Sequence, residues 1–317
     1  MSAATSATRP TITCVGSMMI DLVFYSADIP AEGETVFGDD FAQGFGGKGA
    51  NQCVVAALLG ADVAMIGALG DDGFGRETIA NFESFGIDAS QVLLLEDSYS
   101  GVANIVVEPG GGNRIILGAG ANLRLTPEHV EQAFAQLPKP TVVLSQLEVP
   151  QEAIVRGFEL AKMAGATTIL TPAPAAPVNS DLLAVTDWFV PNHHELAVLA
   201  GVEDVGEDHE RWVSTAAQFA AEADANVVLT MGAGGAALLR PGAEPVQVTS
   251  PKVEAVDTTG AGDALCGSFA WALASGREPE DALRLAVRLA ADSVTRRGTQ
   301  TSYAREEDLQ RLLTDEG

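Results

Sequence analysis

Short apolar runs alternate with helical stretches through the middle of the chain, and this alternation limits the possible folds more than any other feature. Residues 141–147, 167–170 and 188–190 are apolar, β-prone runs, and each is followed by a helical stretch. Such an alternation predicts parallel strands joined by crossover helices. With 317 residues, 47% of them hydrophobic, the chain can bury a large core. We therefore expect an α/β fold with a doubly wound, mostly parallel sheet flanked by helices.

Polar residues stand directly after several of these predicted strands. Glu148 follows the first of the three runs, and Asn192 and Glu195 follow the third. An earlier β-prone run, residues 11–16, ends in Gly and is followed by Ser and then by Asp21. In doubly wound sheets ligands bind at the carboxyl ends of the strands, so these side chains are candidates for a site.

Two β-prone excursions interrupt the alternation. Residues 20–44 are strand-like and are broken by Pro and Gly, so no helix fits there. Residues 96–118 contain two β runs separated by Pro-Gly-Gly-Gly at 109–112, which is a hairpin signal. No internal repeat, low-complexity tract or linker divides the sequence. We therefore expect a single domain over residues 10–315 that contains both excursions.

The Gly-rich stretch at residues 257–263, Asp-Thr-Thr-Gly-Ala-Gly-Asp, is the strongest candidate site. It lies between a strand-like run, residues 253–256, and an apolar helical run, residues 264–274. Its three small residues leave the first N–H groups of the helix uncovered, and these donors, aided by the helix dipole, suit a phosphate. Asp263 is then placed to accept a hydroxyl proton in phosphoryl transfer. The alternative is a simple turn in which Asp263 caps the helix.

A second Gly-rich stretch covers residues 44–52 and leads into an apolar helix predicted over residues 53–59. It matches G-x-G-x-x-G, but no buried strand precedes it, and Gly49 stands where a Walker A loop has Ser or Thr after Lys48. We interpret it as a glycine platform for a flat, hydroxyl-rich ligand that Asn51 can hydrogen-bond. A helix N-terminal turn is the alternative.

Two smaller features follow later in the chain. The predicted strand at residues 227–229 leads into a Gly-rich loop, residues 230–235, which permits close approach of the backbone to a ligand. His193 and His194 are adjacent, and no third His or Cys has suitable spacing for a metal site. We therefore expect these two histidines to be exposed to solvent.

The charge balance and the cysteines exclude several classes of protein. The chain has 18 Lys and Arg against 43 Asp and Glu, a net charge of −25, which repels nucleic acid and anionic membranes. No apolar run reaches the length of a membrane span, and the first residues lack the apolar core of a signal peptide. Cys14, Cys53 and Cys266 are scattered and suggest small buried apolar residues. We expect a cytoplasmic protein without disulfides and without nucleic-acid or membrane partners.

The two Gly-rich signatures, residues 46–52 and 257–263, resemble those of the ribokinase family of carbohydrate kinases. Smaller matches extend over nearly the whole chain: Gly33-Glu34-Thr35, Ala119-Gly120-Ala121-Asn122, Gln146-Leu147-Glu148, Pro172-Ala173-Pro174-Ala175, Asn192-x-x-Glu195 and Gly298-Thr299-Gln300. The resemblance implies a ribokinase-like fold in which the β excursions form a small lid sheet. It also implies transfer of phosphate from ATP to a sugar, with a pattern most similar to the ribose kinases of the family.

The resemblance further implies roles for single residues. Asp263 would accept the proton of the sugar 5-hydroxyl, and the anion hole would be formed by Gly260, Ala261 and Gly262. The sugar pocket would be lined by Met19, Asp21, Gly47, Lys48, Asn51, Ala103, Glu148 and Asp263. The ATP and Mg²⁺ side would comprise Asn192, Glu195, Thr230, Gly232, Gly234, Gly235 and Gly262, with Glu195 acting on the metal through water. An activating K⁺ would be held by Asp257, Thr259, Ser293, Arg296, Gly298 and Ser302.

Three positions depart from the pattern of the family. Met19 stands where the family has a sugar-contacting Asn, which removes one polar contact. Thr171 replaces an Asn, and Val287 replaces an Asn or His near the expected adenine site. These departures concern sugar and nucleotide contacts and leave the phosphoryl-transfer residues unchanged.

We hypothesise an ATP-dependent kinase that phosphorylates D-ribose at the 5-hydroxyl. The alternative within the family is a kinase of another sugar or of a nucleoside, and the alternative of a different class is a non-catalytic sugar sensor. The excursions carry Phe24, Phe37, Phe41 and Ile105 but no Lys that would guard an exposed edge. Together with the resemblance, this predicts a homodimer through the lid strands, and a monomer with its lid folded onto its own body is the alternative.

Overall fold

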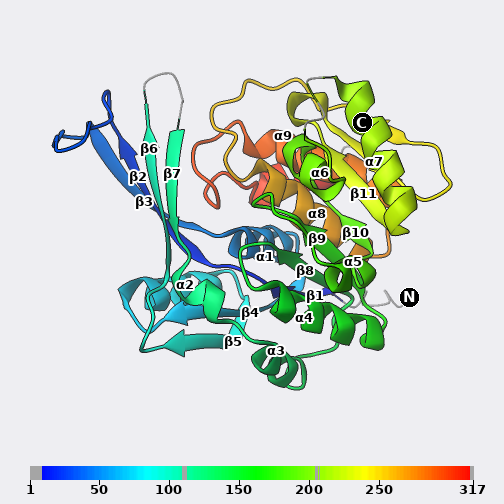
Figure 1. The fold of residues 1–317 in the computed structure, drawn as a ribbon, viewed down its shortest axis with the longest axis horizontal. Coiled ribbons are helices and arrows are strands. Elements are labelled where there is room, and N and C mark those ends of the chain that lie inside the picture. Colours follow the sequence, from blue (N-terminus) through cyan, green and yellow to red (C-terminus); the bar gives the residue numbers. More distant parts are fainter. Residues whose placement is uncertain (1–8, 109–112, 204–205, 207, 315–317) are drawn as a thin grey trace, which may run out of the picture.

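The computed structural model describes residues 9–108, 113–203, 206 and 208–314. Within these residues a nine-stranded sheet has the order β13 (Val246–Val248), β12 (Ala236–Leu239), β11 (Asn226–Thr230), β10 (Trp188–Phe189), β9 (Thr167–Thr171), β8 (Val142–Gln146), β1 (Thr11–Val15), β4 (Asp62–Gly70) and β5 (Asp88–Leu95) (Figure 1). The strands from β11 to β5 pair in parallel, and β12 and β13 are antiparallel at one edge. The predicted mostly parallel α/β sheet is confirmed.

Helices cover both faces of this sheet. One face carries α1 (Lys48–Leu58), α2 (Gly73–Ser84), α8 (Ala261–Ala274), α9 (Pro279–Ser293) and α10 (Glu306–Thr314). The other carries α3 (Pro127–Phe134), α4 (Gln151–Ala164), α5 (Ser180–Ala184), α6 (His193–Leu199) and α7 (His209–Ala223). Val142 and Leu144 pack with the first set and Val143 with the second. Because successive side chains of a strand point to opposite faces, burial on both faces explains the continuous apolar runs.

The two β excursions form a separate four-stranded sheet, here called the lid sheet. Its order is β3 (Asp40–Gly46), β2 (Met19–Tyr25), β6 (Gly101–Val107) and β7 (Asn113–Gly118). The central pair, β2 and β6, is parallel, and the outer pairs are antiparallel. The lid sheet projects from the body of the molecule (Figure 1). The hairpin predicted at 109–112 lies outside the described residues.

The sheet topology places a switch point between β1 and β8. From β1 the sheet extends to β4 and β5 on one side and to β8 and the later strands on the other. Ligands of doubly wound sheets bind at such a switch point, outside the carboxyl ends of the strands. The residues that follow β1 and β8, including Ser17 and Glu148, therefore lie where a ligand is expected.

Three local predictions are wrong. Residues 253–256 form no strand, and Val253 and Val256 are exposed. An apolar run forms a strand only where a neighbouring strand pairs with it, and these residues pair with none of the described strands. Helix α1 begins at Lys48 rather than at residue 53. Its first turns carry the polar residues Asn51 and Gln52, and these side chains are buried against other polar groups, so they belong to the helix although they break its apolar pattern. Helix α8 begins at Ala261 rather than at residue 264, directly after a left-handed Gly260.

Other features were missed or remain open. Strands β5, β12 and β13 were not predicted from the sequence. The three cysteines are buried and free, as expected. Among the described residues, every helix is too short or too polar to span a bilayer. The single domain over residues 10–315 stays a prediction.

Candidate active site

Asp263 lies in the first turn of α8 with 7% of its surface exposed. Oδ2 accepts a hydrogen bond from Nδ2 of Asn51 at 2.9 Å, and Oδ1 accepts one from Nε2 of Gln52 at 3.0 Å. It does not cap the helix, because the capping position is Gly260. Both carboxylate oxygens are thus held by amides from α1, which packs against α8.

The N-terminus of α1 depends on glycine. Gly47 caps the helix with φ 86°, and a Cβ there would stand 2.7 Å from Met18 Cα and from Met19 N. A side chain at this position would therefore collide with the start of β2. The helix N-terminal turn is therefore present, and the platform for a ligand stays a prediction.

A cavity of about 140 Å³ opens beside Asp263. Its lining residues come from α1, α8 and the carboxyl ends of β9, β10 and β11: Lys48, Thr171, Ala173, Val190, Asn192, Glu195, Thr230, Gly260, Gly262 and Asp263. The two predicted Gly-rich signatures and the Asn192–Glu195 pair thus meet at one cavity.

The loop before α8 is shaped for an anion. Gly260 has φ 78°, and a Cβ there would lie 2.6 Å from Thr299 Cγ2. At Gly262, by contrast, a Cβ would meet no heavy atom within 4 Å, and Gly262 lines the cavity. Ala261 is the first helical residue, and its N–H donates to the carbonyl oxygen of Thr258 at 3.3 Å. The start of the helix lies at the cavity wall through Gly260, Gly262 and Asp263, where the first N–H groups of a helix can meet an anion.

Glu148 is fixed at the switch point between β1 and β8. Oε2 accepts hydrogen bonds from Oγ of Ser17 at 2.5 Å and from the backbone N–H of Lys48 at 3.0 Å. Ser17 Oγ in turn accepts the N–H of Gly49 at 3.3 Å. The carboxylate therefore lies at the N-terminus of α1, where the helix dipole favours a negative charge.

Asp21 projects from β2 toward the same region. A Cβ on Gly46 would lie 2.3 Å from Asp21 Oδ1, so the glycine makes room for this carboxylate. Burial, together with the nearby charges of Glu148 and Asp263, raises the pKa of Asp21 to about 7. Met19 lies on the same face of β2, two residues earlier, and Ala103 pairs with Asp21 from β6.

Lys48 is the cation among these acids. Burial opposes its charge, but the nearby carboxylates outweigh burial and raise its pKa: Asp263, Glu148, Glu195 and Asp21. The ammonium group therefore stays charged at neutral pH. It supplies one positive charge at the cavity to four surrounding carboxylates.

The predicted nucleotide side starts at α6. Asn192 and Glu195 form a reciprocal capping box: Asn192 Oδ1 accepts the N–H of Glu195 at 2.9 Å, and Glu195 Oε2 accepts the N–H of Asn192 at 2.8 Å. Burial raises the pKa of Glu195 more than these hydrogen bonds lower it. Thr230 lines the cavity, whereas Gly232, Gly234 and Gly235 lie in the adjoining turn and are absent from its lining.

Three residues of the predicted K⁺ site are joined directly. Asp257 accepts hydrogen bonds from the backbone N–H groups of Thr259 and Gly298, each at 2.9 Å. Burial opposes ionisation, but the hydrogen bonds to Thr259 and Gly298 outweigh it and lower the pKa of Asp257. The N–H of Asp257 donates to the carbonyl oxygen of Val294 at 3.2 Å, which brings the later segment alongside.

The other three predicted residues lie in that later segment. Arg296 Nε donates to the carbonyl oxygen of Ser302 at 2.8 Å, and the N–H of Arg296 donates to the carbonyl of Ser293 at 3.3 Å. The segment is therefore a compact loop of carbonyl and hydroxyl oxygens. Its oxygen atoms, together with a charged Asp257, are of the donor type that a potassium ion prefers.

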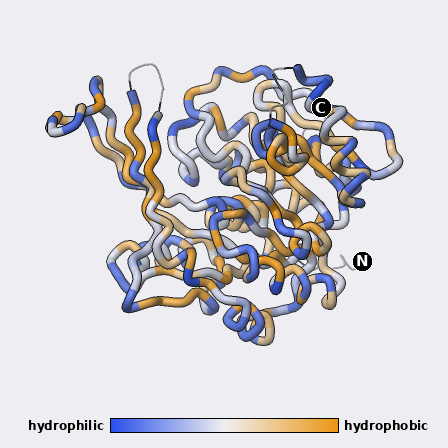
Figure 2. Tube along the Cα trace, viewed as in Figure 1, coloured by the Kyte–Doolittle hydropathy of each residue, from blue (hydrophilic) through white to orange (hydrophobic). Residues whose placement is uncertain are grey.

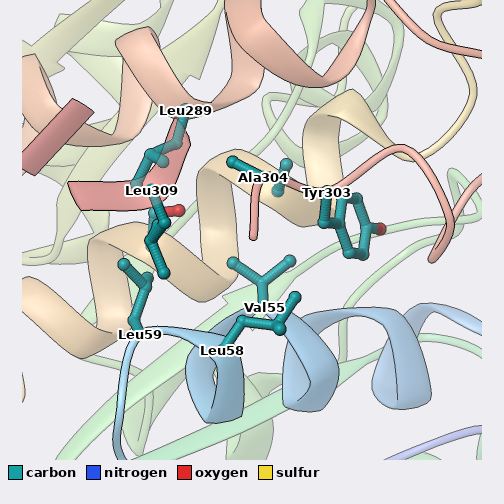
Figure 3. Close-up of a pocket in the computed structure, with 9 residues that line it drawn as sticks. Val55, Leu58, Leu59, Leu289, Tyr303, Ala304 and Leu309 are labelled. Atoms are coloured by element: carbon teal, nitrogen blue, oxygen red, sulfur yellow. The ribbon is translucent and has the colours of Figure 1, made fainter. Parts of the chain in front are cut away.

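A second cavity is not a substrate site. It has about 20 Å³, the space of roughly one water molecule, and lies between α1, α8 and the C-terminal segment (Figure 3). Apart from Ser268 and Tyr303 its walls are aliphatic. It is a packing gap in the core, and no residue that we predicted for the site lines it.

One histidine differs from the prediction. His194 is exposed, but His193 is only half exposed and stacks on Trp212 with ring centroids 4.2 Å apart. A Trp nineteen positions later in the sequence gave no signal of this contact. Among the described residues, no group of three or more His, Cys, Asp or Glu is placed to hold a metal ion.

Comparison with known proteins defines the family. A sequence profile of the pfkB family carbohydrate kinases matches residues 9–306. The chain belongs to this family. The kinase is 40% identical over 304 residues to the deoxyribokinase of Salmonella typhi, and the alignment covers 96% of this chain and 98% of the relative. It is 36% identical over 300 residues to the ribokinase of Schizosaccharomyces pombe, covering 92% and 94%.

Solved structures agree with this assignment. The kinase matches Arabidopsis thaliana ribokinase complexed with ribose and ATP at a TM-score of 0.87, with 29% identity and 96% and 99% coverage. It matches Thermotoga maritima ribokinase at 0.85, with 32% identity and 96% and 100% coverage. The ribokinase-like fold and the ATP-dependent sugar kinase predicted from the sequence are confirmed.

Some residues that build the site were counted only as parts of motifs. The sequence signatures contain three glutamines to which no role was assigned, Gln52, Gln146 and Gln300. Ser17 was noted only because it follows a predicted strand. Gln52 and Gln146 are fully buried, and Gln300 is 5% exposed. Gln52 and Gln146 each stand at the end of an apolar run, and an uncharged amide in that place indicates a buried hydrogen-bonding position. Gln300 stands between two threonines and carried no such signal.

Proposed function

We propose that the kinase transfers the γ-phosphoryl group of ATP to the 5-hydroxyl of D-ribose. The observation that supports this best is the position of Asp263. Its carboxylate is buried at a cavity wall, at the start of α8 and close to Asp21 and Glu148. A sugar sensor would need neither a base nor an anion cradle.

The proposed reaction follows from these groups. Asp263 accepts the proton of the 5-hydroxyl as its oxygen attacks the γ-phosphorus, and the bond to the β,γ-bridging oxygen breaks to release ADP. The N–H groups at residues 260–262 stabilise the charge on the transferring phosphoryl group. Asp21, Asn51 and Glu148 orient the sugar through its other hydroxyls.

The residues present also suit the expected metal ions. Mg²⁺ would arrive with the ATP phosphates and retain waters, which neutralises phosphate charge. Glu195 has lone pairs left beyond its capping hydrogen bonds, so a water-bridged contact fits. Asp257 and the oxygens of residues 293–302 would hold K⁺ without touching the substrate.

A second substrate, 2-deoxy-D-ribose, is favoured by one residue. Met19 is 3% exposed and shares the face of β2 with Asp21, so an apolar side chain lies where the family has a sugar-contacting Asn. A sugar without the 2-hydroxyl would leave no polar group unpaired against it. The relative from Salmonella typhi is a deoxyribokinase.

A sugar panel tests the proposal. The kinase is assayed with ATP and Mg²⁺ by coupled ADP detection on ribose, 2-deoxyribose, fructose and adenosine. We expect the highest kcat/KM for ribose. A higher kcat/KM for 2-deoxyribose would show that 2-deoxyribose, and not ribose, is the preferred substrate. In that case the Met19→Asn variant should shift the preference toward ribose. Turnover of none of the four would sink the proposal. The homodimer and the cytoplasmic location stay predictions.

A further inference from the structure

We propose that Gln52 and Gln300 are positioning residues that fix the carboxylate of Asp263 for proton transfer. The proposal rests on the proposed kinase function and deepens it. Neither amide lines the cavity, so both act through other side chains. Each stands in one of two chains of amide hydrogen bonds that end on Asp263.

The inner chain approaches Asp263 from the core. Gln146, at the end of β8, donates through Nε2 to Oε1 of Gln52 at 2.7 Å. Gln52 then donates through Nε2 to Asp263 Oδ1 at 3.0 Å and to Thr171 Oγ1 at 3.2 Å. Gln52 and Gln146 are both fully buried. No water competes for these donors.

The outer chain approaches the other carboxylate oxygen. Asn81, on α2, donates through Nδ2 to Gln300 Oε1 at 2.9 Å. Gln300 donates through Nε2 to Asn51 Oδ1 at 3.1 Å, and Asn51 donates to Asp263 Oδ2 at 2.9 Å. This chain connects α2 and the segment after α9 to the base.

Both chains point in one direction. In each link of the two chains the donor lies on the side away from Asp263 and the acceptor on the side toward it, because an ionised carboxylate only accepts hydrogen bonds and thereby sets the orientation of each amide behind it. The order has a cost: Gln146 Oε1 is buried and has no hydrogen-bond partner among the residues that the structure describes. Turning that amide over would set two carbonyl oxygens against each other. The hydrogen bonds to Asp263 are therefore satisfied, while the oxygen of Gln146 is left unpaired among the described residues.

The two chains differ in what else they contact. The inner chain reaches Asp263 directly, and its second hydrogen bond goes to Thr171 Oγ1 at the cavity wall, whereas the residues proposed to orient the sugar are Asp21, Asn51 and Glu148. The outer chain passes through Asn51, which is also the proposed sugar contact. Loss of Gln52 should therefore lower kcat without changing the KM for the sugar, whereas loss of Gln300 should change both.

The test uses Gln52→Met, which keeps the volume and removes the hydrogen-bonding groups. We expect kcat to fall about 10- to 100-fold, the effect of misplacing a reacting group by around 1 Å, with an unchanged KM for the sugar. In an Asp263→Asn background the same change should add nothing, because its path of action is already lost. An equal fall in that background would show a general structural effect and overturn the proposal.

Further variants complete the design. Gln300→Met should lower kcat and raise the KM for the sugar. Gln146→Met leaves the bond between Gln52 and Asp263 in place and should cost less than Gln52→Met. Thermal unfolding checks the fold of each variant. Should Gln52→Met not fold, Gln52→Asn withdraws the same amide by one methylene and carries the same expectations.

A crystal structure of Gln52→Met gives a readout that needs no turnover. We expect the Asp263 carboxylate to leave its position between the two amides, and an unmoved carboxylate would overturn the proposal. If the wild-type protein turns over no sugar but this shift occurs, the kinase assignment fails while the positioning role stands. Unchanged kcat in a folded Gln52→Met would instead overturn the positioning role alone.

Discussion

Single side chains set the chemistry of the site through their charges. Four carboxylates, those of Asp21, Glu148, Glu195 and Asp263, surround the one ammonium group of Lys48. Like charges in a poorly solvated place disfavour ionisation of at least one of them. Burial is the largest cause of the raised pKa values of Asp21 and Glu195, and the negative charge of Asp263 adds to it.

The role of Asp263 can be tested by removing its basicity. Asp263→Asn keeps the shape of the side chain but cannot accept the hydroxyl proton. We expect kcat to fall by about 10²–10⁴, the usual loss for a general base, while sugar affinity measured by calorimetry survives. A variant with near-wild-type kcat would refute the role, whatever its KM.

Asp21 predicts a pH dependence of sugar binding. With its pKa at about 7, the carboxyl is largely protonated below neutrality and ionised above it. Sugar hydroxyls donate to the ionised form, so the KM for the sugar should fall as the pH rises from about 6 to about 8. The slope cannot exceed about tenfold per pH unit for one group. Asp21→Asn should flatten the profile, and an unchanged slope in that variant would contradict the assignment.

Sequence patterns found the charged residues of the site but not the amides behind them. Asp263 and Glu148 follow from helix starts and strand ends, which are local features. Gln52 and Gln300 take their partners 211 and 249 positions away, so only the folded chain reveals their contacts. The stacking of His193 on Trp212 is likewise a contact between two elements, α6 and α7, which the local sequence around His193 does not indicate.

At the scale of elements, two helix N-termini converge on the cavity. Helices α1 and α8 both begin after a glycine with positive φ, Gly47 and Gly260, and both glycines stand where a Cβ would collide with a neighbour. The alternation of strands and helices was predictable because it depends on apolar patterns. The helix starts were placed too late, since polar residues in the first turns lacked the apolar periodicity that marks a helix.

The proposed K⁺ site predicts a choice between monovalent cations. Residues 257–259 lie beside residues 293–302, so an ion held there would fix the loop that carries Gly260. We expect higher kcat in potassium than in sodium at matched ionic strength. Matching is required because, with a net charge of −25, general screening could mimic activation. Asp257→Asn should remove the difference, and equal rates in both salts for the wild type would count against the site.

At the scale of the whole molecule, the lid sheet exposes an apolar face. Phe24, Phe41 and Ile116 are 39%, 50% and 74% exposed, and strand register places all three on the face opposite Asp21. Phe24 and Phe41 also contact each other, with ring centroids 5.1 Å apart. Hydrophobic residues run along these projecting strands (Figure 2).

This surface predicts a homodimer. Pairing of two lid sheets would cover the exposed apolar side chains, and a two-fold contact is the simplest closed arrangement. Light scattering over a dilution series should give the mass of a dimer. Ile116→Arg should weaken it and, because the proposed sugar contact Asp21 lies on β2 of the same sheet, raise the KM for the sugar. A monomer mass under conditions of full activity would contradict the prediction.

The contact between α1 and α8 also bears on biosynthesis. Asn51 is among the first sixth of the residues to be made, whereas Asp263 and Gln300 are among the last. A growing chain therefore carries Asn51 for most of its synthesis and gains the proposed base only near the end. A product that terminates before α8 lacks the proposed base, so we expect truncated copies not to consume ATP at this site.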